Sequence, residues 1–153
     1  MELTQLLKVE NIRVPLAAQD KEAAIHELVD VLEQNGALSD ADAVRKAVFE
    51  REATRSTGIG DGLAIPHGKT DGVESLVVAF GRTAEPLDFG AIDGKPVNLI
   101  WLLSSPPDKS GPHIEALKVI SKVMAKAAVR RQMMEVDSAE AMYEVLKTAE
   151  AAG

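Results

Sequence analysis

A glycine-rich segment that ends in a histidine is the part of the sequence best suited to chemistry. Residues 56–69 read Ser-Thr-Gly-Ile-Gly-Asp-Gly-Leu-Ala-Ile-Pro-His-Gly-Lys, so the histidine is His67. Alternate glycines bend the backbone and leave its N–H groups uncovered, while Pro66 restricts its own φ and that of Ile65. We therefore expect His67 at a rigid strand end or turn. A neutral imidazole held there beside free amides can take up an anion covalently, above all a phosphoryl group.

Well-known motifs for other chemistries do not fit this segment. It has no Gly-Lys-Ser/Thr phosphate loop, and its glycine spacing differs from the dinucleotide fingerprint; a Gly-x-Ser-x-Gly elbow is also missing. The chain has 3 histidines and no cysteine, which is a poor ligand supply for zinc. We therefore predict no metal and no cofactor. Composition alone would also allow an ordinary turn with a structural histidine.

Length, composition and charge narrow the class of protein. The 153 residues fit one domain, 1–153, whose core must be aliphatic because only 3% of residues are aromatic. A net charge of −7 disfavours nucleic acid and favours approach to a basic protein partner. Without cysteine there are no disulfides and no thiol catalysis. The chain shows no leader and no long apolar run, so we expect a cytoplasmic protein without membrane insertion.

Hydrophobic periodicity predicts helices before and after a cluster of strands. Before the strands we expect an opening turn around residues 3–7, a helix between an Asp20 cap and Asn35-Gly36, and a helix from a Ser39/Asp42 capping box to about residue 52. After the strands we expect a helix that is entered at Pro112 and continues to 124, a helical segment around 129–134 and a last helix from Ser138. The expected strands are an edge strand at 11–15 and two buried strands at 76–80 and 97–103. This order favours a single α/β domain with a mixed β-sheet flanked by helices on both faces.

Further short segments accompany the glycine–histidine stretch. They are Arg51-Glu52, Pro86-Leu87-Asp88-Phe89, Ile92-Asp93-Gly94-Lys95-Pro96-Val97 and the helix that opens at His113. Together with 56–60 and 64–69, they resemble the IIA domains of the bacterial phosphoenolpyruvate-dependent phosphotransferase system. The resemblance is to the fructose/mannitol class, which includes a nitrogen-related regulatory branch, and it covers nearly the whole chain.

The resemblance implies a phosphocarrier. His67 would accept a phosphoryl group from the phosphohistidine of the carrier protein HPr and pass it to a IIB partner in sugar uptake. Alternatively, the phosphorylation state would act as a signal that controls binding to kinases, transporters or other regulators. A module that binds an anion without covalent chemistry is a third reading, with much less in its favour.

The resemblance also implies which residues surround the phosphoryl group. Arg51 and His113 would be neighbours of the phosphohistidine, and the Thr57 hydroxyl is a weaker candidate. The amides of Gly58, Ile59 and Gly60 could stabilise the transferred group without a metal. Taken by themselves, Arg51 and His113 would be read as ordinary residues at helix ends. We expect the rings of His67 and His113 to lie close enough to share one oxyanion.

Overall fold

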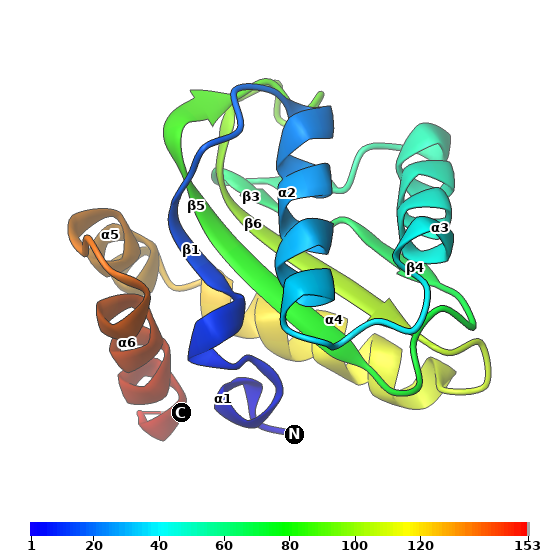
Figure 1. Ribbon diagram of the computed structural model, residues 1–153. Coiled ribbons are helices and arrows are strands. Elements are labelled where there is room, and N and C mark those ends of the chain that lie inside the picture. The colour runs from blue at the N-terminus through cyan, green and yellow to red at the C-terminus, as the bar shows by residue number, and fades with distance from the viewer. Residues whose placement is uncertain (153) are drawn as a thin grey trace.

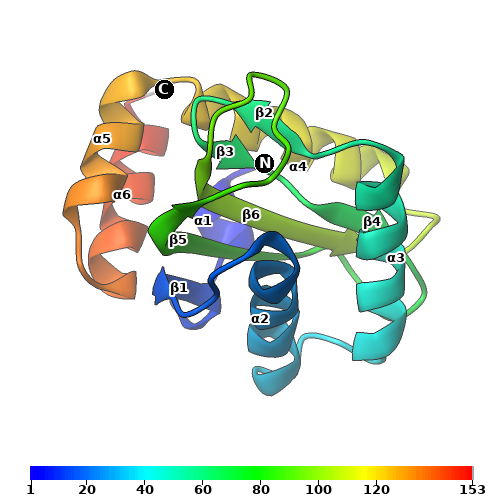
Figure 2. The ribbon, with the colours of Figure 1, turned by 90° about the horizontal axis from the view of Figure 1, so that it is seen from above.

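The computed structural model, which describes residues 1–152, shows one mixed sheet with helices on both faces (Figure 1, Figure 2). The helices are α1 (Leu3–Leu6), α2 (Lys21–Gln34), α3 (Ala41–Thr54), α4 (Ser110–Met124), α5 (Ala127–Glu135) and α6 (Ala139–Ala151), with a 3-10 turn at Val9–Asn11. The strands are β1 (Ile12–Leu16), β2 (Gly58–Gly60), β3 (Leu63–Ala64), β4 (His67–Lys69), β5 (Val77–Leu87) and β6 (Val97–Ser105). The predicted fold class is confirmed.

The sheet is built around the long strands β5 and β6. The strand order is β1-β5-β6-β3-β2, and β4 pairs with β6 beyond β3. Strand β5 is antiparallel to β6, whereas β1 runs parallel to β5 and both β3 and β4 run parallel to β6. One edge of β6 thus holds two short strands in succession, with Ala64 opposite Ile100 and His67 opposite Leu103.

Each face of the sheet carries its own core. Alternate residues of β6 point to opposite faces, as expected for a strand buried on both sides. Trp101 stacks on Phe80 with ring centroids 4.2 Å apart, in the core formed with α1, α4, α5 and α6. Ile100 and Leu102 belong to the opposite core, formed with α2 and α3. In Figure 1, α2 and α3 lie in front of the sheet and α4 passes behind it.

The predicted cap at Asp20 is present, Ser138 at the predicted start of the last helix is its cap, and the predicted capping box at Ser39 is wrong. Asp20 accepts a hydrogen bond from the Ala23 amide at 2.8 Å, and Ser138 accepts one from the Ala141 amide at 3.1 Å. The cap of α3 is Asp40, which bonds the Ala43 amide, and not Ser39. The backbone N–H groups of Ser39 and Asp40 both donate to the Gly72 carbonyl, at 2.8 and 3.0 Å. The helix therefore starts one residue later than predicted.

Two predictions about strand length and helix orientation also need correction. Strand β5 continues to Leu87, well past the expected end at residue 80, because β6 provides partners as far as Val97. In α4 the buried face contains His113, Ala116 and Ile120, whereas Ile114 is 50% exposed. The apolar spacing of residues 114, 117, 120, 123 and 124 predicts a buried Ile114, but at this end of the helix His113 faces inward and Ile114 lies at the surface.

Candidate functional site

Two histidines meet in a pocket at one end of β6. His67 begins β4, and His113 is the fourth residue of α4. Their ring centroids are 5.4 Å apart with an interplanar angle of 61°. The pocket has a volume of about 420 Å³ and is lined by Ala47, Arg51, His67, Gly68, Lys69, His113, Ile114 and Leu117. The expected closeness of the two rings is therefore found in the structure.

A glycine explains how α3 comes close enough to contribute to this pocket. Gly68 lies between His67 and Lys69, and a Cβ placed on it would be 2.8 Å from the Ala47 carbonyl carbon and 2.9 Å from the Val48 nitrogen. Only a residue without a side chain allows the helix backbone to pack this tightly on β4. The contact brings Arg51, one turn further along α3, to the rim of the pocket.

The hydrogen bond of His67 determines which ring nitrogen is free. Its Nδ1 lies 2.7 Å from the carbonyl oxygen of Ile65. A carbonyl oxygen only accepts, so Nδ1 carries the proton and Nε2 keeps its lone pair. Burial lowers the pKa of His67, and the charges of Arg51 and Lys69 act in the same direction, against the Ile65 hydrogen bond and Glu52, which raise it. The ring is neutral near pH 7 and presents Nε2 as a nucleophile.

His113 is the more deeply buried of the two rings. It is 2% exposed, and its Nδ1 lies 2.6 Å from the Oγ of the buried Ser105. Burial lowers the pKa of His113 to about 4, and repulsion from Lys69 and from the protonated form of His67 acts in the same direction. The ring is therefore neutral at pH 7. If the Ser105 hydroxyl donates to Nδ1, the proton of His113 is on Nε2, where it can be donated to an anion.

Two cations complete the pocket. Arg51 uses Nη1 to donate to the Arg55 carbonyl at 2.8 Å, which holds the guanidinium in place and leaves other N–H groups for a ligand. Lys69 shares a face of β4 with His67, because residues two apart on a strand point the same way. Its Nζ lies 2.9 Å from Ser110 Oγ at the start of α4. The pocket thus combines a neutral nucleophile with two positive groups.

The structure does not bring the other predicted residues into this pocket. Thr57 is 4% exposed, and both its amide and its hydroxyl donate to the Glu52 carboxylate. Gly58, Ile59 and Gly60 form β2, and the Gly58 amide is close to Ser56 Oγ at 3.0 Å. Gly58 pairs with Ala64, three residues before His67, which corresponds to roughly 10 Å along a strand. Gly58 and Ile59 line a separate pocket with Gly90 and Ile92.

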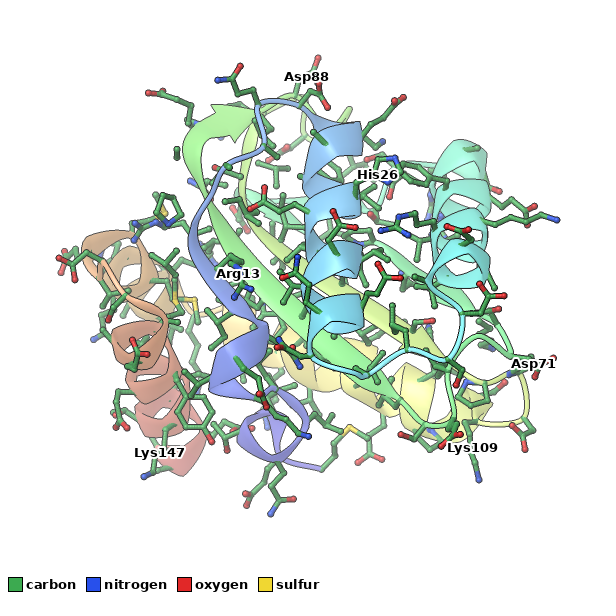
Figure 3. All side chains as sticks on the ribbon, viewed as in Figure 1. Arg13, His26, Asp71, Asp88, Lys109 and Lys147 are labelled. Atoms are coloured by element: carbon green, nitrogen blue, oxygen red, sulfur yellow. The ribbon has the colours of Figure 1, made fainter. Side chains whose placement is uncertain are left out.

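Lys69 and Ile114 line the pocket and Ser105 bonds His113, but none of the three was assigned a role in the site from the sequence. Lys69 could have been found, since it follows His67 at the strand spacing of two. Ser105 gave no signal, because its role depends on β6 ending beside α4. Ile114 was expected in the core. The third histidine, His26, is exposed and packs beside Phe49 between α2 and α3, where Figure 3 shows it.

Among residues 1–152, no group of three or more histidine and carboxylate side chains is arranged to hold a metal ion. The same residues include no helix with both the length and the apolar character needed to cross a membrane.

Known proteins are similar to this chain in sequence and in fold. The chain is 35% identical over 146 residues to the fructose-specific EIIABC component of the phosphotransferase system of Bacillus subtilis, covering 95% of this chain but 23% of that protein. It is 34% identical to the fructose-specific EIIA component of Haloferax volcanii, covering 95% of this chain and 94% of the relative. The crystal structure of the nitrogen regulatory protein IIA-Ntr of Neisseria meningitidis superposes with a TM-score of 0.86 at 36% identity, covering 94% of this chain and 98% of that one.

The family assignment rests on nearly the full length of the chain. The sequence profile described as "Phosphoenolpyruvate-dependent sugar phosphotransferase system, EIIA 2" matches residues 5–149, which include every strand and the whole pocket. The protein therefore belongs to the EIIA type 2 family of the phosphoenolpyruvate-dependent sugar phosphotransferase system.

Proposed function

We propose that the protein is a phosphocarrier that accepts a phosphoryl group on Nε2 of His67 from phospho-HPr and passes it to a IIB partner. The observation that carries this proposal is the hydrogen bond from His67 Nδ1 to the Ile65 carbonyl, which leaves Nε2 unprotonated in a pocket with two cations. Family membership supplies the nature of the donor and acceptor, and the fructose-specific relatives favour fructose- or mannitol-type uptake.

The transfer needs no proton movement at His67. The N–P bond of the donor phosphohistidine breaks as the lone pair of Nε2 forms the new P–N bond. The proton stays on Nδ1, hydrogen-bonded to the Ile65 carbonyl. Onward transfer reverses these events, with the His67 ring leaving as the neutral imidazole. Phosphoryl transfer through a loose transition state depends mainly on positioning and on charge stabilisation. Arg51 and Lys69 provide the positive charge, and the neutral His113 provides a hydrogen-bond donor without adding a third cation.

The surface around the pocket suits a protein partner. Ile114 is 50% exposed beside His67, and Leu117 adds a half-buried apolar side chain one turn later. Apolar side chains that surround a polar centre are typical of the buried middle of an interface. The net charge of −7 favours the approach of a basic partner, mainly by raising the rate of encounter.

Reconstituted phosphotransfer tests the proposal. The protein is incubated with phosphoenolpyruvate, Enzyme I and HPr, and its intact mass is measured. The wild type should gain one phosphoryl group that is labile in acid and stable in base, whereas His67→Ala should gain none. His26→Ala is the matched control and should behave as the wild type. An unmodified wild type, or a modified His67→Ala protein, would show that the proposal is wrong.

A regulatory output is the second candidate, favoured by the likeness to the IIA-Ntr structure, which extends over 98% of that chain. In this case phosphorylation still occurs, but its consequence is a change in binding to a kinase, a transporter or another regulator. Pull-down experiments with wild type and His67→Asp, which mimics added negative charge, separate the two outputs. Transfer of the phosphoryl group to a purified IIB protein identifies the transport role.

A further inference from the structure

A buried carboxylate next to the site has entered the description so far only as a charge that raises the pKa of His67. Glu52 lies in the last turn of α3 and is 7% exposed. It accepts the Thr57 amide at 2.9 Å and the Thr57 hydroxyl, and its Oε2 lies 2.7 Å from Lys21 Nζ. Burial alone would raise the pKa of Glu52, but hydrogen bonds from Lys21 and Thr57 outweigh it and hold the pKa below its usual value. The carboxylate is ionised and all its bonds lie within the fold.

A contribution to stability is a weak explanation for the presence of the Glu52–Lys21 ion pair. Removing two charges from water costs several kcal/mol, and well-packed apolar residues often serve as well. Positioning is a better explanation, because Glu52 holds one particular residue twice. Thr57 ties the end of α3 to the start of β2, and both of its donors are directed to one carboxylate.

From Thr57 a short series of hydrogen bonds leads to the nucleophile. The Thr57 carbonyl accepts the Ile65 amide at 3.1 Å, and the Ile65 carbonyl in turn accepts His67 Nδ1 at 2.7 Å. Pro66 follows Ile65 directly, so the backbone between these two bonds has little freedom. The Glu52 carboxylate is therefore linked to the Ile65 carbonyl, which selects the tautomer of His67, through the backbone of Thr57 and Ile65.

Lys21 and Ser56 fix the other side of the same segment. Lys21 Nζ also donates to the Phe89 carbonyl at 3.2 Å and lies 5.0 Å from the centre of the Phe89 ring. Ser56 Oγ donates to the same carbonyl at 2.7 Å. Glu52 connects Lys21 to Thr57, because its carboxylate binds Lys21 on one side and Thr57 on the other.

We infer that Glu52 is a positioning residue that, through Thr57 and Ile65, holds His67 with its proton on Nδ1 and its lone pair on Nε2. Without the carboxylate, the Thr57 amide and hydroxyl lose their partner, so the Thr57 carbonyl is held less firmly against the Ile65 amide and the Ile65 carbonyl is directed less closely at His67. His67 then divides between its two tautomers, and only one of these presents Nε2 as a nucleophile. The effect on phosphoryl transfer rests on the proposed function, whereas the effect on the tautomer does not.

Imidazole NMR measures the tautomer directly. Long-range ¹H–¹⁵N correlation spectra at neutral pH identify the protonated nitrogen of each histidine in the wild type, Glu52→Ala, Thr57→Val and Thr57→Ser. We expect His67 to be protonated at Nδ1 in the wild type and in Thr57→Ser, which keeps the hydroxyl. Glu52→Ala and Thr57→Val should show a mixture. Glu50→Ala, an exposed neighbour on the same helix, is the matched control and should keep the wild-type pattern.

Phosphoryl transfer gives the second readout. The rate should fall in proportion to the fraction of His67 that remains protonated at Nδ1, so a fraction of about one half halves the rate. Trp101 fluorescence confirms that each variant is folded. A folded Glu52→Ala protein whose His67 stays protonated at Nδ1 would overturn the inference. A shifted tautomer in a protein whose wild type never accepts a phosphoryl group would refute the proposed function and leave the role of Glu52 standing.

Discussion

Acidification should destabilise the protein through His113, and replacing that histidine should remove much of the effect. The ring is 2% exposed, and burial lowers its pKa to about 4, from 6.5 for an ordinary histidine. Between these two pH values the unfolded chain binds a proton at residue 113 that the folded protein does not bind. Stability therefore rises with pH across this window, and it is lost as the pH falls below 6.5.

The size of the effect follows from the shift in pKa. A decrease from 6.5 to about 4 corresponds to about 3 kcal/mol in the free energy of unfolding, because one pKa unit is worth about 1.4 kcal/mol. About 3 kcal/mol is a substantial part of the unfolding free energy of about 5–15 kcal/mol that is typical of folded domains. His67, whose pKa is also lowered by burial, adds a contribution of the same sign.

Urea denaturation at a series of pH values measures this contribution. Trp101 is the single tryptophan and is fully buried, so its fluorescence reports unfolding. In His113→Gln the slope of unfolding free energy against pH, between pH 4 and 6.5, should be smaller than in the wild type by up to about 1.4 kcal/mol per pH unit. His26→Gln is the matched control and should keep the wild-type slope. If His113→Gln also keeps that slope, the ring is not buried in its neutral form and the reasoning fails.

Three further substitutions test the packing that supports the site. Gly68→Ala places a methyl group 2.8 Å from the α3 backbone and should lower the free energy of unfolding, measured in urea, by about 1–3 kcal/mol. It should also slow phosphoryl transfer, and a transfer rate equal to that of the wild type would show that α3 does not set the position of Arg51. Ile120→Ala removes a fully buried side chain and should cost about 2–5 kcal/mol, with Ile114→Ala, half exposed, as a nearly neutral control for stability. Asp20→Ala removes the cap of α2 and should cost about 1 kcal/mol; an unchanged urea midpoint would mean that this hydrogen bond contributes nothing.

The sequence predicted local features more accurately than it predicted how elements approach one another. Asp20 and Ser138 are caps because each has an oxygen that reaches an amide three residues later, and this depends on nothing distant. Ser39 satisfied the same local rule, but the cap is Asp40, one residue further along. Two adjacent residues could each cap α3 by this rule, so the local pattern alone did not decide between them.

The candidate site shows the same division. His67 was predictable because proline and glycine restrict the chain around it, and family resemblance added Arg51 and His113. The glycine amides were expected beside His67 because they precede it closely in sequence. In the structure β2 turns back antiparallel to β3, and the Ile65-Pro66 step carries the chain onward to β4. Sequence distance is short here, but the strand geometry converts it into spatial separation.

The outermost strands of the sheet bear on how the protein behaves when it is concentrated. Unpaired backbone groups at a strand edge can recruit strands of other molecules and start aggregation. Strand β1 contains Pro15, which has no N–H to offer, and β2 is 3 residues long with glycine at both ends. Strand β4 lies directly under the backbone of α3. Every outer strand is thus short, interrupted or shielded, and concentrated solutions should resist the growth of fibres.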